Sequence, residues 1–272
     1  KATRGRASIM GIDVAQDPQS VRQIIGLAGQ YAAVDENLTG RENLRLIGRL
    51  THLPRDLAYK RADEMLERFD LNPAADRPAR TYSGGMRRRL DLAAALVHRP
   101  PVVFLDEPTT GLDPSSRSDL WAIIGELVND GTTVLITTHY LDEADRLSDR
   151  IIVIDDGAII AQGTSGELKS NLGAAVVEVT MHDTDGARKA SAALAAVGTG
   201  AIAGDGRTIE IRANDGPRGM MDVVRILDRE GLVPADLGIR ESTLDDVFLS
   251  LTGGKAKSKA PAPKPASRRG RP

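Results

Sequence analysis

The sequence predicts an α/β protein with a mostly parallel sheet and a helical subdomain, followed by a small α+β domain of the split-βαβ type. Val102–Leu105 and Thr133–Ile136 are short, continuous apolar runs, which are typical of parallel strands buried on both faces. The residues between these runs have the apolar spacing of a helix, so strands and helices alternate. Beyond residue 172 the predicted order is β-α-β-β-α-β, which indicates a split-βαβ domain.

Two strands and three helices are predicted before the first of these runs. Ala7–Val14 is expected to be a strand, and Ile24–Leu27 a second, shorter one. Thr39 and Glu42 have the spacing of a capping box, in which each side chain bonds the other residue's backbone N–H, and therefore begin a helix. The next helix is predicted from about Pro54 to Phe69, whose apolar residues fall on one face.

A third helix begins at Ser83 and continues through Leu96, so the helical subdomain is expected over about residues 39–99. After the second apolar run, Ile151–Ile154 and Ala158–Ala161 are predicted to pair as a hairpin. Asp156-Gly157 supplies its turn, because these two residue types tolerate a left-handed backbone.

A second capping box, formed by Thr164 and Glu167, begins a connecting helix. The elements predicted beyond it are Ala175–Met181, Gly186–Val197, a short strand near Ala201, Thr208–Ile211, Met220–Glu230, Leu237–Arg240 and Ser242–Leu251. We therefore expect one domain over residues 1–172, an accessory domain over 173–252 and a disordered basic tail over 253–272.

Composition excludes several classes of function. The 272 residues include no cysteine, so disulfides and thiolate metal sites are excluded. Seven of the 36 Lys and Arg residues lie in the acid-free tail 253–272, so acids outnumber bases elsewhere, which argues against a nucleic-acid partner. No stretch is long and apolar enough to span a bilayer, so any membrane role is expected to pass through a partner protein.

Asp106 and Glu107 follow the first buried run directly, at the strand end where open α/β sheets bind ligands. An aspartate there can hold Mg²⁺ through its water shell. The adjacent glutamate can orient and deprotonate an attacking water. The structural alternative is that both acids merely cap the following turn.

A second candidate site is Ser83-Gly84-Gly85-Met86, where a serine and two glycines open a helix. Such a helix start directs backbone N–H groups toward an anion, and the helix dipole favours negative charge there. The alternative is an ordinary capped helix with a flexible entrance.

Three further features are ambiguous when each is taken alone. Gln30 ends a short strand and could be a surface turn residue, and His139 could be a hydrogen-bonded histidine at a strand end. The loop Pro108–Pro114, which contains Asp113, could be simple turn chemistry. Taken together with the two candidate sites above, the order and spacing of these three features argue against a chance arrangement.

From Lys1 to about Leu172 the chain resembles the ATP-binding subunits of ABC transporters, which have a P-loop NTPase fold. The matching positions are Gln30 for the Q-loop, Ser83–Met86 for the signature motif, Asp106 for the Walker B magnesium residue, Glu107 for the catalytic carboxylate, Leu112-Asp113 for the D-loop and His139 for the switch histidine. Gln30 is also expected to reach the magnesium ion. Within the family, residues 29–35, Ser83–Leu90 and Ser242–Leu249 are similar to the daunorubicin-resistance type of drug exporter.

One family motif has no match. The phosphate loop G-x-x-x-x-G-K-[S/T] would require a Gly-Lys pair, and Gly254-Lys255 in the tail is the only one. Because the chain also begins with Lys1 and not Met, we expect an N-terminal truncation of about 60 residues, judged by the usual size of a strand–loop–helix unit. The truncated chain is expected to be inactive alone.

The resemblance implies a complete protein that binds ATP and Mg²⁺ and closes as a head-to-tail homodimer, with Ser83 contacting the γ-phosphate held by the other subunit. Hydrolysis would drive a separate membrane permease from the cytoplasmic face, exporting drug-like compounds or lipids. Two alternatives stay open: an ABC ATPase without a transport role, and a non-hydrolysing fragment that acts as an interaction module. A membrane-subunit gene beside this one would argue against the first.

Overall fold

The structure is a computed structural model that describes residues 3–29, 34–173, 175–195, 197–198, 200–213 and 215–251. The chain divides into two compact units, Lys1–Glu143 and Ala144–Pro272. The boundary near residue 172 stays a prediction, and the tail 253–272, predicted to be disordered, lies outside the described residues. None of the described helices combines the length and the apolar character needed to cross a membrane.

The first unit is built on a three-stranded parallel sheet. Its strands are β3 (Ile25–Ala28), β4 (Val102–Asp106) and β5 (Thr133–Thr137), in the order β3-β4-β5. The predicted parallel strands are therefore confirmed. Leu27 lies beside Phe104, and Phe104 beside Leu135, so the three form a row across the sheet.

The expectation that these strands are buried on both faces is wrong for the described residues. Val103 and Leu105 are buried, but Leu27 is 62% exposed and Leu135 is 51% exposed. The covered face packs against the helix α4 (Gly84–Leu96), and the approach is close at Gly26. A Cβ atom on Gly26 would lie 2.4 Å from a backbone oxygen of α4.

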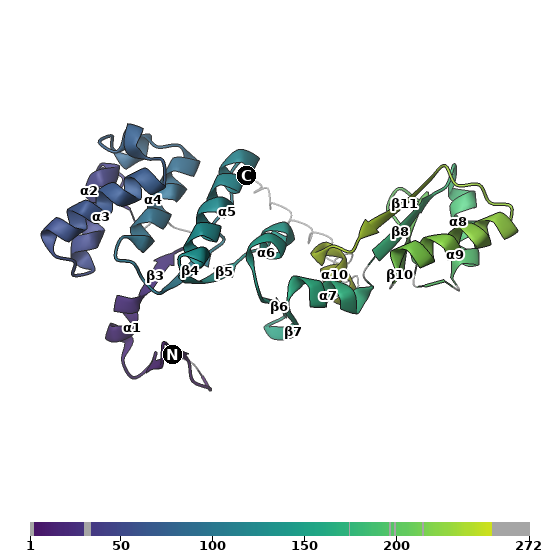
Figure 1. The fold of residues 1–272 in the computed structure, drawn as a ribbon, viewed down its shortest axis with the longest axis horizontal. Coiled ribbons are helices and arrows are strands. Elements are labelled where there is room, and N and C mark those ends of the chain that lie inside the picture. The colour runs from purple at the N-terminus through teal and green to yellow at the C-terminus, as the bar shows by residue number, and fades with distance from the viewer. Residues whose placement is uncertain are drawn as a thin grey trace, which may run out of the picture. The chain divides into compact units, whose positions relative to one another are not determined.

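Three helices make up the predicted helical subdomain, which Figure 1 shows in purple to blue. These are α2 (Gly40–Leu50), α3 (Arg55–Arg68) and α4, with two short 3₁₀ turns at Asn72–Ala74 and Ala79–Thr81. Thr39 and Glu42 form the predicted capping box, because each side chain accepts a hydrogen bond from the other residue's backbone N–H. Two further helices follow the strands of the sheet: α5 (Pro114–Asn129) after β4, and α6 (Leu141–Leu147) after β5.

The predicted strand Ala7–Val14 is instead a small hairpin. Its strands are β1 (Ser8–Ile9) and β2 (Ile12–Asp13), and both turn residues between them have positive φ, as a type I′ turn requires. The helix α1 (Pro18–Ile24) follows and was not predicted. Its start has a recognisable pattern, because Asp17 caps it and a proline occupies the first turn.

The second unit begins within α6 and continues with the predicted hairpin, β6 (Ile151–Asp155) and β7 (Ala158–Gly163), and then with α7 (Ser165–Leu172). Asp156 and Gly157 form the turn with φ values of 46° and 77°. The capping box predicted at the start of α7 is also present.

A four-stranded antiparallel sheet follows, in the order β11-β8-β10-β9. Its strands and helices are β8 (Ala175–Thr180), α8 (Thr184–Leu194), β9 (Gly200–Ile202), β10 (Thr208–Ala213), α9 (Gly216–Arg229) and β11 (Asp236–Glu241). The helices α8 and α9 lie together against the sheet (Figure 1). The buried residues between them are Val177, Val179, Met181, Ala187, Ala190, Leu194, Ile209, Ile211, Val223 and Leu227. This element order agrees with the one predicted.

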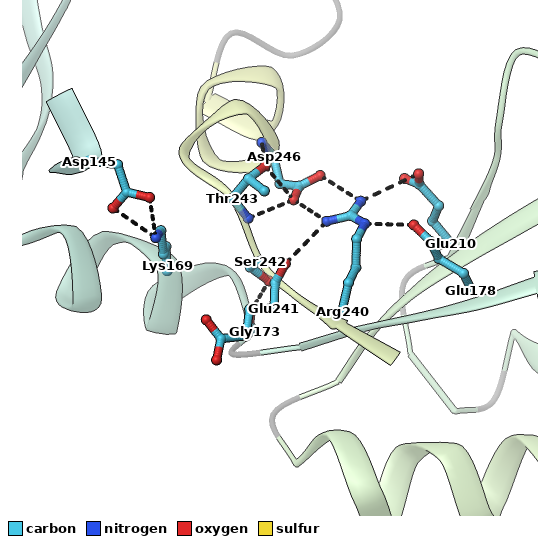
Figure 2. Close-up of polar contacts among 10 residues, drawn as sticks. All are labelled: Asp145, Lys169, Gly173, Glu178, Glu210, Arg240, Glu241, Ser242, Thr243 and Asp246. Carbon is cyan, nitrogen blue, oxygen red and sulfur yellow. Dashed lines mark hydrogen bonds and ion pairs between the residues drawn. The ribbon is translucent and has the colours of Figure 1, made fainter. Parts of the chain in front are cut away.

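The last helix, α10 (Leu244–Leu251), is fastened to this sheet by a network around Arg240 of β11 (Figure 2). The Arg240 guanidinium donates hydrogen bonds to Glu178, Glu210 and Asp246. Glu178 and Glu210 lie directly opposite each other on neighbouring strands, where like charges repel. Arg240 offsets that repulsion and joins the sheet to α10 through Asp246.

Candidate functional site

The carboxyl end of β4 positions two adjacent acids. Asp106 is the last residue of the strand, and Glu107 follows it with φ of 46°, in the left-handed region that non-glycine residues seldom adopt. The Glu107 backbone N–H donates to the Thr137 carbonyl on β5, 2.9 Å away. Such strained residues persist only where their surroundings hold them, and they cluster at functional sites.

Asp106 accepts a hydrogen bond from the hydroxyl of Thr137, its partner in the register of β4 and β5. Its half-buried carboxylate is the one acid of the strand itself. In the described part of the chain, no three His, Cys, Asp or Glu side chains gather into a cluster that could hold a metal ion. A single carboxylate with a neighbouring hydroxyl fits Mg²⁺ that takes its remaining ligands from water and phosphate.

Glu107 directs its two carboxylate oxygens toward different partners. Oε1 lies 3.4 Å from Nδ1 of His139. Oε2 accepts a hydrogen bond from the hydroxyl of Thr110, 3.2 Å away. The Glu107 side chain is 29% exposed and that of His139 54% exposed, so water can reach both groups.

Ser83 caps α4, and its hydroxyl accepts a hydrogen bond from the Met86 N–H at 3.2 Å. This bond uses the Met86 amide. The amides of Gly84 and Gly85, in the first turn of the helix, have no intrahelical partner. They are therefore the groups of this segment that can bind an anion.

The start of α5 lies beside the start of α4. Asp113 caps α5 by accepting hydrogen bonds from the Ser116 N–H at 3.0 Å and the Ser116 hydroxyl at 2.8 Å. These bonds lower the pKa of Asp113. A Cβ atom on Gly85 would lie 3.1 Å from the same hydroxyl, so Ser116 places the segments of Gly85 and Asp113 next to each other.

The predicted residues thus form two groups. One contains Asp106, Glu107 and His139, and the other contains Ser83–Met86 and Asp113. None of the contacts described for this chain joins Ser83 to Glu107 or His139. Gln30 lies outside the described residues.

Sequence reasoning missed three residues that contact this site: Arg88, Thr110 and Thr137. Thr137 could have been found, because it ends the strand next to β4 and pairs with Asp106. Arg88 carried no such signal, since it stands between two other arginines. Its guanidinium bonds the carbonyl oxygens of Asp106 and Pro108, on either side of Glu107.

Three aspartates beside turns and helix starts of the second unit have structural partners. Asp183 caps α8 and Asp215 caps α9. Asp205 accepts hydrogen bonds from the backbone of Thr208 and Arg207, which lower the pKa of Asp205 to about 2. These aspartates stabilise turns and helix starts.

Comparison with known proteins identifies the family. The family described as "ABC transporter" matches residues 1–110. The daunorubicin resistance ATP-binding protein DrrA2 of Streptomyces coeruleorubidus is 49% identical over 256 residues, covering 93% of this chain and 80% of that protein. The daunorubicin/doxorubicin resistance ATP-binding protein DrrA of Streptomyces peucetius is 48% identical, covering 94% of this chain and 78% of that protein.

A solved structure agrees with this assignment. It is a dimeric ATP-binding cassette in a post-hydrolysis state with ADP and phosphate, 28% identical to this chain, with a TM-score of 0.54. The match covers 60% of this chain and 74% of that one. The predicted ABC ATPase fold and the predicted family are confirmed: the chain belongs to the ATP-hydrolysing, ATP-binding subunits of ABC transporters, within the daunorubicin-resistance group of that family.

Proposed function

We propose that the complete protein binds Mg·ATP at the carboxyl end of β4, and that Glu107 is the general base for hydrolysis. This proposal rests mainly on the placement of Glu107, which follows the end of a parallel strand. Its carboxylate lies 3.4 Å from His139. A base must lie within hydrogen-bond reach of the water it deprotonates, and such contacts often tighten only when substrate is bound. Partial exposure of both side chains leaves room for that water.

The two side chains have complementary roles in this proposal. Glu107 accepts the proton of the attacking water through one carboxylate oxygen, while Thr110 and His139 fix its orientation. With both ring nitrogens protonated, His139 donates its Nδ1 hydrogen toward Glu107 and its Nε2 hydrogen toward the γ-phosphate. Bound ATP supplies the phosphoryl group to be transferred, and positioning these groups is the main contribution of the protein to such a reaction.

Asp106 is proposed to hold Mg²⁺ through its water shell, with Gln30 as a second contact to the ion. The hydroxyl of Thr137 supports this assignment, because it orients the Asp106 carboxylate from the neighbouring strand. Carboxylates that hold magnesium are usually fixed in this way by outer hydrogen bonds.

The second group of residues is proposed to act in a homodimer. Ser83, Gly84, Gly85 and Met86 would form an anion site for the γ-phosphate of ATP bound by the other copy, and Asp113 would line the same interface. The free amides at the start of α4 support this role. The dimeric state of the solved relative also supports it.

Export by a separate membrane permease is the proposed biological role, with the ATPase on the cytoplasmic face of the membrane. The relatives are described as daunorubicin and doxorubicin resistance proteins, which supports a hydrophobic drug-like cargo. ATP-binding subunits of exporters work with membrane components, and no nucleic-acid partner is proposed. We also propose that residues 1–172 form the ATPase domain and 173–252 an accessory domain.

An efflux experiment tests this function. Cells that express the full-length protein with its membrane partner should accumulate less daunorubicin than cells with the permease alone. Glu107→Gln should abolish the difference. Glu126→Gln, an exposed Glu of α5 paired with Arg68, should leave it unchanged. Equal drug accumulation with and without the wild-type protein would contradict the export function.

A further inference from the structure

Arg88 is one of three consecutive arginines on α4, and its side chain lies in a different environment from those of its neighbours. Arg87 pairs with the exposed Glu36, and Arg89 pairs with Asp119. The Arg88 side chain is only 13% exposed. Burial lowers the pKa of Arg88.

The Arg88 guanidinium donates mainly to backbone carbonyl oxygens. Its Nε donates to the Pro108 carbonyl at 2.8 Å, and Nη2 donates to the Asp106 carbonyl at 3.0 Å. Nη1 donates to the Gly29 carbonyl and lies 3.4 Å from the Asp91 carboxylate. One side chain of α4 therefore bonds the ends of β3 and β4 and the loop after β4.

The bond to Asp106 has a specific consequence for Glu107. The Asp106 carbonyl and the Glu107 N–H belong to the same peptide group. Its oxygen accepts from Arg88 and its N–H donates to Thr137, so the orientation of this peptide is fixed from both sides. The bond to Pro108 fixes the next carbonyl beyond Glu107.

Glu107 has φ of 46° and needs such support, because a non-glycine residue in this conformation is strained and persists only where its surroundings hold it. From these contacts we infer that Arg88 is the positioning residue of Glu107, which holds the backbone of residues 106–108 in the conformation that aims the catalytic carboxylate. This inference rests on the proposed role of Glu107. Since Ser83 begins the same helix, Arg88 also joins the anion-binding helix start to the base.

Lysine cannot replace arginine in this position. The guanidinium is a planar fork whose separate nitrogen atoms reach three different carbonyl groups, whereas an ammonium is a single point donor. Arg88→Lys therefore keeps the charge but loses most of the backbone bonds. Arg87→Lys is the matched control, because its neighbouring side chain makes an exposed ion pair instead.

The test is steady-state and single-turnover ATP hydrolysis by the full-length protein. Arg88→Lys should lower kcat by about 10²-fold, the typical cost of a misplaced catalytic group, while KM for ATP changes little. Arg87→Lys should change neither. Arg88 acts through Glu107, so Arg88→Lys should cause no further loss in a Glu107→Gln background.

Two outcomes would overturn the inference: a wild-type kcat for folded Arg88→Lys, or the same fractional loss with and without Glu107. If Arg88→Lys does not fold, Arg88→Gln is tested instead, because its side-chain amide retains one donor group. The same changes in kcat are expected for it. The activity of Glu107→Gln separates a failure of the proposed role of Glu107 from a failure of the inference about Arg88. Near-wild-type hydrolysis by it would refute the proposed role of Glu107, and with it the inference. A slow Glu107→Gln beside a normal Arg88→Lys would refute the inference alone.

Discussion

The Nδ1 atom of His139 lies 3.4 Å from the Oε1 atom of Glu107, and the two residues follow neighbouring parallel strands. This contact predicts that His139 orients the base and presents a donor to the phosphate. His139→Ala should lower kcat by about 10²–10³-fold, the usual cost of removing a donor that stabilises a transition state. The measurement is ATP turnover by the full-length protein. His182→Ala, an exposed histidine after β8, is the control, and an equal effect of both changes would rule out the role of His139.

Asp106→Asn should weaken nucleotide binding as well as turnover. The carboxylate is oriented by Thr137 and would hold Mg²⁺ through water, so its loss should reduce the apparent magnesium affinity by about 10–100-fold. Calorimetry with Mg·ATP, repeated with ATP and EDTA, measures this directly. Asp130→Asn removes an exposed acid that pairs with Arg68 and should leave the affinity unchanged. Unchanged magnesium dependence in Asp106→Asn would exclude Asp106 as the magnesium residue.

The ion pair between Arg240 and Asp246 makes the stability of the second unit depend on pH. Burial is the largest influence on Asp246 and raises its pKa, but the hydrogen bonds from Arg240 and Thr243 together outweigh it and lower the pKa to about 2. The unfolded pKa is higher, near the ordinary aspartate value. The contribution of this ion pair to the stability of the second unit is therefore fully present above about pH 4. It is lost as the pH falls toward 2.

Hydrogen exchange at the β11 amides of the full chain can follow this loss. Asp246→Asn should reduce the opening free energy there by about 1–3 kcal/mol at pH 7 and should flatten the acid dependence. Asp222→Asn, which breaks an exposed pair with Arg225, should cost less than about 1 kcal/mol. Retained acid dependence in Asp246→Asn would assign the effect to other groups.

The uncovered face of the β3-β4-β5 sheet predicts aggregation of the 272-residue chain on its own. Leu27 and Leu135 are exposed and lie in one row with the half-buried Phe104, and exposed apolar patches promote association. Replacing both leucines with threonine should slow aggregation measured by light scattering. Threonine at the exposed Leu50 and Val233, outside this sheet, is the control. Equal aggregation of the two double variants would show that the sheet face is not responsible.

Local signals predicted much of the fold. The capping boxes at Thr39 and Thr164 and the cap at Ser83 formed as expected, because each depends on residues within one helical turn. Asp106 and Glu107 were also predictable, since a buried strand and two acids are adjacent in the sequence. The agreement is best where neighbours along the chain determine the geometry.

Features that depend on distant residues, and one local turn, were missed. Nothing in the sequence separates Arg88 from its two neighbours, because the backbone carbonyls that it bonds lie 18 to 59 residues away. The strand expected at Ala7–Val14 was interrupted by left-handed backbone at Met10 and Gly11, and methionine gives no turn signal. An apolar run such as Val102–Leu105 indicates a strand but does not show how many faces the described elements cover.

Central to this account is the claim that Glu107 is the base for ATP hydrolysis. The most direct measurement is ATP turnover by full-length Glu107→Gln, with its dimer fraction determined in the same samples. Glutamine keeps the size of the side chain but is not a proton acceptor at neutral pH, so turnover should fall by about 10²–10⁴-fold while an ATP-bound dimer accumulates. Hydrolysis near the wild-type rate, without accumulation of the dimer, would contradict the account and leave Glu107 as a residue that only shapes the turn.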